Sequence, residues 1–154
     1  MEIIHLIYSQ MMIDFRAETP DELLQSLKPH PISIVLAQAA MESAWGTSRF
    51  FRVANNVFGV WSFDAGEARI AAGVKRGGDT IYVRRYDDLG ASIKDYYRVL
   101  ARGSAFKSFR ERRVETEDPF ELVKELDNYS EKGAEYGNEL ASIIRFNKFT
   151  EFDK

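Results

Sequence analysis

The sequence of 154 residues predicts a mainly helical α+β fold with one small β lobe around residues 57–86. Segments with helix start and stop signals lie on both sides of this stretch, which itself combines β-branched and aromatic residues with turn residues. The composition, 45% hydrophobic and 29% charged, is that of a folded chain with one substantial core. No internal repeat or linker interrupts the chain. We therefore expect a single domain over residues 1–154, with residues 1–18 at its periphery.

Two helices with clear boundary signals are expected near the N-terminus, besides a candidate helix at residues 2–15. Thr19-Pro20-Asp21-Glu22 provides a capping threonine, a first-turn proline and a capping-box glutamate, and Pro29 ends the helix that follows. The next helix covers residues 32–44 and stops at Gly46. Its middle is apolar nearly all round, which is typical of a helix buried inside the protein.

The β lobe follows a short helix at residues 47–54. Residues 57–63 are β-branched and aromatic, and residues 80–86 alternate in the way expected of a strand. Residues 64–66 and 76–79 have turn chemistry. We therefore expect a small β element inserted into a helical protein.

Helix signals resume after the β lobe. An aspartate at 87 or 88 caps the first helix, and an Asp-Pro-Phe-Glu run repeats the capping pattern further on. The last helix carries apolar residues along one side. The expected segments are residues 88–100, a short helix around 106–109, residues 118–126 and residues 132–146.

Composition narrows the chemistry. The chain has no cysteine and two histidines, which excludes disulfides, thiolate zinc sites and cysteine nucleophiles, and disfavours a Ser-His-Asp triad. A net charge of −3 disfavours nucleic-acid binding. No metal or cofactor is implied, no membrane span is visible, and residues 1–8 make a poor secretion signal. Carboxylates and tyrosines are thus the leading candidates for chemistry.

Glu42 stands out because it lies on the helix predicted to be buried. An ionised carboxyl in apolar surroundings is unfavourable unless it is paired or protonated. On helical spacing its neighbours are Gln38 one turn back and Trp45 one turn on. A carboxyl beside a tryptophan in a half-dry cleft suits a general acid. The alternative is a structural role, in which Glu42 pairs with Arg49 or with a tyrosine of the last helix.

Several blocks resemble the glucosaminidase family (glycoside hydrolase family 73), and its Bax-like branch most of all. Residues 37–48, Ala-Gln-Ala-Ala-Met-Glu-Ser-Ala-Trp-Gly-Thr-Ser, carry the specific likeness. Residues 55–59 (Asn-Asn-Val-Phe-Gly), residues 83–87 with the helix after them, and residues 129–147 resemble later blocks of the family in the same order. The likeness covers about residues 29–148.

The resemblance implies a lysozyme-like fold, with a helical lobe, a β-hairpin lobe and a glycan groove between them. It implies that Glu42 is the catalytic acid that cleaves the β-1,4 bond after N-acetylglucosamine in peptidoglycan, and that Tyr129 lies close to this acid. It also implies a substrate in the periplasm or cell envelope. Candidates for binding the glycan are Gln38, Trp45, Asn56, Phe58, Trp61 and Tyr136. For Phe58, core packing is the better interpretation.

The second catalytic group is not evident, because the Glu-Tyr pair that many family members carry on the hairpin is missing here. Glu67 is the nearest candidate in chain order, and Asp64 and Asp79 lie in turns of the same lobe. In enzymes that invert the anomeric configuration, the catalytic base lies about 6.5–9.5 Å from the acid. In enzymes that retain it, the nucleophile lies about 5–5.5 Å from the acid. A third route uses the N-acetyl group of the substrate, with Tyr129 as a polarising partner.

Two other functions are compatible with the sequence. A lytic transglycosylase needs one glutamate, no activated water, and ends in a 1,6-anhydro product. A non-catalytic domain would bind the same wall glycan without cleaving it. In each case we expect a monomer that contacts peptidoglycan strands.

Overall fold

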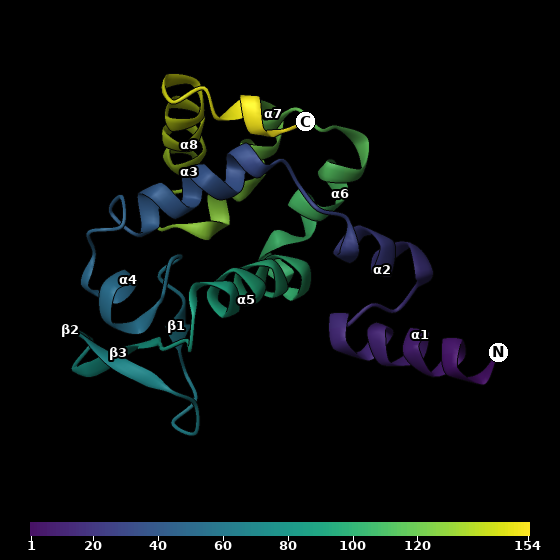
Figure 1. Ribbon diagram of the computed structural model, residues 1–154, viewed down its shortest axis with the longest axis horizontal. Helices are drawn as coiled ribbons and strands as arrows, with labels where there is room; N and C mark the ends of the chain where they lie inside the picture. The colour runs from purple at the N-terminus through teal and green to yellow at the C-terminus, as the bar shows by residue number, and fades with distance from the viewer. The chain divides into compact units, whose positions relative to one another are not determined.

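The computed structural model describes residues 1–154 and divides the chain into two compact units (Figure 1). Residues 1–34 and 98–154 form one unit, and residues 35–97 form the other. The boundaries fall inside two helices, α3 (Ile32–Glu42) and α5 (Leu89–Arg102). The domain boundaries expected from the sequence stay a prediction.

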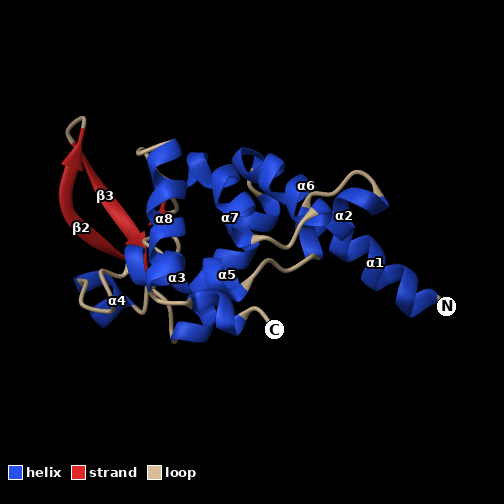
Figure 2. Cartoon of the chain, turned by 90° about the horizontal axis from the view of Figure 1, so that it is seen from above, coloured by secondary structure: helices blue, strands red, loops and turns tan.

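The chain is mostly helical and has one three-stranded antiparallel sheet, so the predicted fold class is confirmed (Figure 2). No helix is long and apolar enough to cross a membrane. Besides α3 and α5, the α-helices are α1 (Glu2–Phe15), α2 (Pro20–Leu27), α4 (Arg49–Ala54), α6 (Lys107–Glu115), α7 (Pro119–Leu122) and α8 (Ala134–Phe146). Three 3₁₀ segments are η1 (Ser104–Phe106), η2 (Val123–Tyr129) and η3 (Phe149–Phe152).

Helix α2 begins where its capping signal predicts. The Thr19 side chain accepts a hydrogen bond from the Glu22 backbone N–H at 3.2 Å, and Pro20 takes the first position, where no N–H is needed. The Glu22 carboxylate accepts from the backbone N–H of Glu18 at 2.8 Å, one residue before the position expected for a capping box. Lys28 is extended because Pro29 follows it, and the helix ends there.

The core of the unit formed by residues 1–34 and 98–154 is built around α8 and η2. These segments, with α6 and α7, bury large apolar side chains, among them Phe109, Leu122, Leu126, Tyr136, Leu140 and Ile144. Arg113 is buried beside them, and its guanidinium donates to the carbonyls of Gln25 and Ser26 at the end of α2. These bonds satisfy carbonyls that a helix end leaves without partners.

Helix α1 buries none of its residues, although it is rich in apolar side chains. Ile3, Ile4, Leu6 and Ile13 are each more than two-thirds exposed. The helix contacts α2 near its C-terminal end, where Met11, Met12 and Phe15 are half-buried.

The sheet has strands β1 (Trp61–Ser62), β2 (Arg69–Arg76) and β3 (Asp79–Arg84) in the order β1-β3-β2. β2 and β3 form the long hairpin in Figure 2, joined by Gly77 and Gly78. Both glycines have positive φ (58° and 94°), as a two-residue type I′ turn requires, so the predicted turn is confirmed.

Two expectations about the β lobe were wrong. The sequence did not predict β2, because Ala71, Ala72 and Gly73 have low strand propensity and a bulge between Ala71 and Lys75 breaks the alternation. Conversely, residues 57–60 form a loop instead of a strand. The backbone N–H of Tyr86 donates to Ala54, which lies outside the sheet, so β3 ends before the predicted residue 86.

His30 predicts an acid-dependent loss of stability. Burial, and then the charge of Arg113, lower its pKa from 6.5 to about 3, so the folded protein holds the ring neutral. The unfolded chain therefore binds an extra proton between about pH 6.5 and pH 3. His30 should remove up to ~1.4 kcal/mol of stability for each pH unit of acidification in this window.

The measurement is the free energy of unfolding in urea at pH 7 and pH 4.5. His30→Gln should show a smaller difference between the two pH values than the wild type, while the exposed His5→Gln should match the wild type. Equal pH dependence in all three proteins would contradict this assignment.

Candidate active site

The end of α3 determines where the Glu42 carboxyl lies. The helix ends at Glu42, two residues before the predicted Ala44. The Trp45 N–H donates to Ala40 O at 2.7 Å and the Ala44 N–H to Met41 O at 3.2 Å, which is the bond pair of a Schellman motif. Ala44 and Trp45 both take left-handed φ values (49° and 55°), which non-glycine residues rarely adopt. Trp45 is therefore not one helical turn beyond Glu42, and the predicted helical spacing fails there.

This turn places Glu42 at the negative end of a helix. Unpaired carbonyls at a helix C-terminus disfavour a nearby carboxylate and so favour its protonated form. The Glu42 side chain is half-buried, and a Cβ added at Gly59 would lie 3.7 Å from Glu42 Oε2. Gly59 itself has φ +66°, a conformation that favours glycine. The carboxyl thus lies beside the backbone of Gly59, which carries no side chain.

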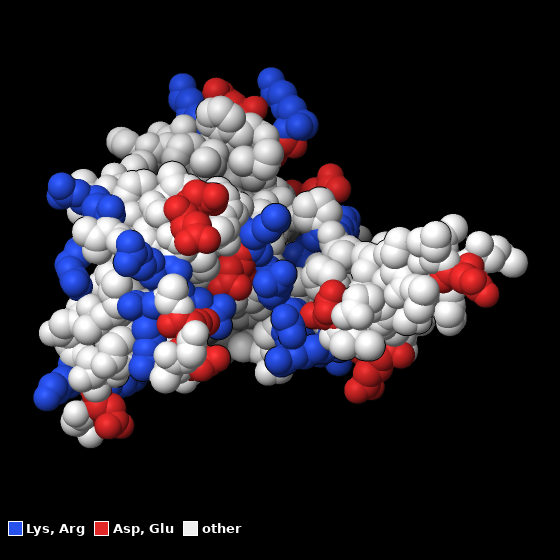
Figure 3. All heavy atoms as spheres, turned by 60° about the horizontal axis from the view of Figure 1, so that its bottom comes forward, with Lys and Arg blue, Asp and Glu red and all other residues white.

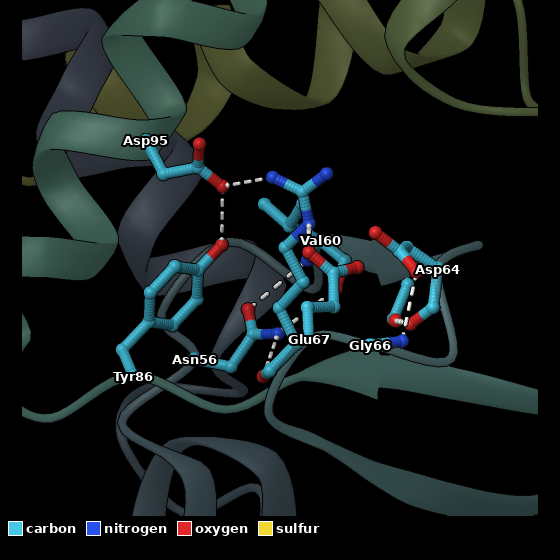
Figure 4. Close-up of polar contacts among 9 residues, drawn as sticks. Asn56, Val60, Asp64, Gly66, Glu67, Tyr86 and Asp95 are labelled. Carbon is cyan, nitrogen blue, oxygen red and sulfur yellow. Dashed lines mark hydrogen bonds and ion pairs between the residues drawn. The ribbon is translucent and has the colours of Figure 1, made fainter.

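Asn56 holds the loop of residues 57–60, which contains Gly59, in place. Its side chain is buried, and Oδ1 accepts from the Val60 N–H at 3.0 Å. Nδ2 donates to Val60 O at 3.0 Å and to Arg84 O at 2.9 Å (Figure 4). One amide therefore closes the 57–60 loop and ties it to β3.

Arg84 connects two carboxylates at the end of β3. Its Nη1 donates to Asp95 Oδ2 at 2.7 Å, and its Nε lies 3.2 Å from Glu67 Oε2. The Tyr86 hydroxyl donates to the same Asp95 oxygen at 2.6 Å (Figure 4). This group of Glu67, Arg84, Tyr86 and Asp95 is called the Arg84 network.

The charges of the Arg84 network stabilise one another. Burial alone would lower the pKa of Arg84, but the hydrogen bond and charge of Asp95, with the charge of Glu67, raise it overall. Burial, followed by the hydrogen bond and charge of Asp95, raises the pKa of Tyr86. Arg84 therefore stays charged and Tyr86 stays protonated at any physiological pH.

Glu67 has one oxygen outside this pairing. Its Oε1 is buried and has no hydrogen-bond partner, while Oε2 faces Arg84. A buried acceptor without a partner is uncommon in folded proteins and needs an explanation.

Comparison with known proteins identifies the family. The model described as "Glucosaminidase: Mannosyl-glycoprotein endo-beta-N-acetylglucosaminidase" matches residues 18–149. This chain belongs to the glucosaminidase family. It is 30% identical to Protein bax of Escherichia coli (strain K12) over 132 residues, which are 82% of this chain and 46% of that protein. The chain thus spans about half the length of this relative.

Solved structures share the fold of this chain. The catalytic domain of the autolysin Auto from Listeria monocytogenes has a TM-score of 0.66 at 19% identity, covering 96% of this chain and 85% of that one. A peptidoglycan hydrolase from Sphingomonas sp. A1 has a TM-score of 0.64 at 20% identity, covering 82% and 81%. A glycoside hydrolase domain of FlgJ from Salmonella typhimurium has a TM-score of 0.57 at 22% identity, covering 91% and 94%. At these identities the likeness shows the lysozyme-like fold.

The candidate glycan-binding residues of the glucosaminidase differ in exposure. Trp45 is 60% exposed and Trp61 is 40% exposed. The rings of Trp61 and Phe63 have centroids 6.2 Å apart, and Phe63 is largely exposed. The Arg76 guanidinium carbon lies over the Trp61 ring, 5.8 Å from its centroid. Both tryptophans therefore offer ring surface on which a sugar could stack.

The remaining candidates are buried, which removes them from direct contact with a glycan in this conformation. Gln38 accepts from the Tyr96 hydroxyl at 2.6 Å, and Phe58 stacks on the Tyr96 ring at 4.0 Å, as the core interpretation of Phe58 predicted. Tyr136 is buried against Tyr129, with the two rings stacked 5.4 Å apart. We therefore treat Gln38, Asn56, Phe58 and Tyr136 as supporting residues.

Sequence analysis did not identify three features of the site: Asp95, the pairing role of Arg84, and the open backbone at Gly59. Arg84 lies at the end of β3, and Asp95 lies on α5, the helix that follows. These opposite charges on the two sides of one strand-to-helix connection were the available signal that the two residues pair. No group of three or more His, Asp or Glu side chains is arranged to hold a metal ion.

Removing the Asn56 amide should destabilise the protein. Asn56→Ala removes three hydrogen bonds to part-buried backbone groups and leaves the Val60 N–H without this acceptor, which should cost about 2–4 kcal/mol of unfolding free energy. Urea unfolding of the variant measures this loss. The matched control is Asn128→Ala, because Asn128 is exposed and makes one 3.3 Å bond to Ala105 O. A similar small loss in both variants would contradict the role of Asn56.

Proposed function

We propose that this chain is an endo-β-N-acetylglucosaminidase that hydrolyses the β-1,4 bond after N-acetylglucosamine in peptidoglycan, with Glu42 as the general acid. The observation that carries the proposal is the half-buried Glu42 carboxyl at the C-terminal end of α3, beside the open backbone of Gly59. Family membership supports glycoside hydrolysis, and the printed names of the structural neighbours, an autolysin and a peptidoglycan hydrolase, support a cell-wall glycan.

Glu42 acts by donating its proton to the glycosidic oxygen as the bond to the anomeric carbon breaks. The positive charge that develops on the sugar ring is typical of glycosidase transition states. An acid that is protonated near neutral pH is needed for this step, and both partial burial and the helix end favour that form of Glu42. Trp61 and Trp45 are proposed to stack on sugar rings.

We propose Glu67 as the second catalytic group. Its Oε1 has no hydrogen-bond partner, so this oxygen is not committed to another donor, and in the proposed mechanism it accepts the proton of the attacking water. Arg84 holds the other oxygen and so orients the carboxylate. Tyr129 is proposed to polarise the substrate N-acetyl group, and its orientation is supported by contacts with the rings of Tyr136 and Phe106.

A lytic transglycosylase is the second candidate, and the ion pair between Glu67 and Arg84 favours it. If the pair holds Glu67 in a structural role, no base remains to activate water. The glycosidic bond from the muramyl anomeric carbon then breaks, the muramyl 6-hydroxyl closes on that carbon, and its proton goes to the Glu42 carboxylate, which yields a 1,6-anhydro end.

The proposed substrate also suggests a place of action. Peptidoglycan lies outside the cytoplasmic membrane, so we propose that the protein works in the periplasm or cell envelope, as a monomer.

Glu42→Gln should fold normally and lose at least about a hundredfold in rate, because the amide cannot donate the proton. The measurement is release of soluble fragments from purified peptidoglycan, together with urea unfolding of the variant. Glu135→Gln, an exposed residue of α8, is the matched control and should keep full activity. Full activity of Glu42→Gln would overturn the proposal. Wild-type binding to wall glycan with no product over long incubation would instead favour a non-catalytic domain.

Glu67→Gln should slow hydrolysis by about a hundredfold, while Asp79→Asn, in the exposed hairpin turn, should not. Mass spectrometry of the products follows the reaction. Reducing N-acetylglucosamine ends are expected, and 1,6-anhydro ends, lighter by one water, would establish the transglycosylase instead. Undiminished hydrolysis by Glu67→Gln would assign the second role to the substrate N-acetyl group.

A further inference from the structure

A cavity of about 380 Å³ lies within the unit formed by residues 1–34 and 98–154. It is lined by the connection between α1 and α2, by α2, by the end of α5 and by the start of α6. None of these lining residues belongs to the candidate active site. The match to the family begins at residue 18, and three lining residues, Phe15, Arg16 and Ala17, precede it. The family match therefore does not include the whole cavity.

The cavity carries an excess of positive charge. Its ionisable lining residues are the cations Arg16, Arg102, Lys107 and Arg110 and the carboxylates Glu18 and Glu22, and four minus two leaves a charge of +2. On the face shown in Figure 3, Lys and Arg side chains lie among Asp and Glu side chains. An excess of +2 around one cavity favours an anionic ligand.

One of the cations, Arg110, is held in place by the fold. Arg110 Nη1 donates to Leu100 O at 2.9 Å and to Gly103 O at 2.7 Å, at the end of α5. Glu22 is engaged with the backbone N–H of Glu18 at 2.8 Å, and Lys107 lies 3.9 Å from Glu111. Arg110 is therefore pre-positioned, while the nearest carboxylate of the cavity already has a backbone partner.

Arg102 gives the decisive observation. Its Nε is buried and has no hydrogen-bond partner. A buried donor in this state is unfavourable, and the guanidinium that carries it belongs to a residue lining the cavity, where an oxyanion can accept from its N–H groups. Guanidinium groups present parallel N–H donors that match the oxygens of phosphate.

We propose that this cavity binds a phosphate group carrying two negative charges, as inorganic phosphate or a phosphate monoester. The dianion balances the +2 excess, which a single carboxylate does not. The volume admits a phosphate with one small substituent. Bound phosphate holds Arg16 of the α1–α2 connection together with Arg102 and Arg110, and this role is independent of the proposed glycosidase activity.

The test is titration of the full chain with inorganic phosphate at constant ionic strength, followed by calorimetry and thermal unfolding. Wild type should bind phosphate and unfold at a higher temperature as phosphate rises. Arg102→Met should weaken binding at least about tenfold. The same variant should be no less stable than wild type without phosphate, since its unpaired donor is gone. Arg98→Gln, an exposed residue one turn earlier on α5 and outside the cavity, should behave as wild type.

A second readout follows the α1–α2 connection. Phosphate should slow tryptic cleavage after Arg16 in the wild type and not in Arg102→Met. Glycerol phosphate distinguishes the sources: tighter binding than inorganic phosphate supports an ester, and weaker binding supports the free ion. Absence of phosphate binding, equal binding by Arg102→Met, or equally tight binding of acetate would overturn the proposal.

Discussion

The candidate site depends on one buried amide. Asn56 bonds Val60 through both of its polar atoms and also bonds the carbonyl of Arg84. The loop it closes includes Gly59, which leaves space beside the Glu42 carboxyl, and the strand it holds ends in the arginine that pairs with Glu67 and Asp95. Because the amide is buried, water does not readily replace it, and losing it removes three hydrogen bonds at once.

The turn after α3 makes the second contribution. A Schellman motif ends the helix at Glu42 and requires a left-handed residue, which here is alanine followed by a second left-handed residue, Trp45. Such backbone strain persists only where surrounding contacts support it, and it is common at functional sites. The bonds from Gly46 N to Ser43 Oγ and from Thr47 Oγ1 to Ala44 O supply local support. The turn exposes Trp45 and leaves the carboxyl half-buried.

Local signals predicted much of the fold. Thr19 and Ser48 cap their helices, Asp88 caps α5, and two glycines make the hairpin turn, because each of these features acts within three or four residues of sequence. The strand that the sequence did not predict depends instead on pairing with another strand. Strand β2 contains Ala71, Ala72 and Gly73, which have low strand propensity, and pairing with β3 makes it a strand.

The sequence by itself determined the family, the mainly helical fold class and the singular position of Glu42, since these follow from local motifs and from one acid in an apolar helix. Only the tertiary structure decided which side chains pair with Arg84. Arg84 pairs with Glu67 and Asp95, and Tyr86 bonds Asp95, although these residues lie on different elements. No spacing along the chain therefore predicts the network. The cavity proposed to bind phosphate is likewise formed by two segments, residues 15–26 and 102–110, that folding alone brings together.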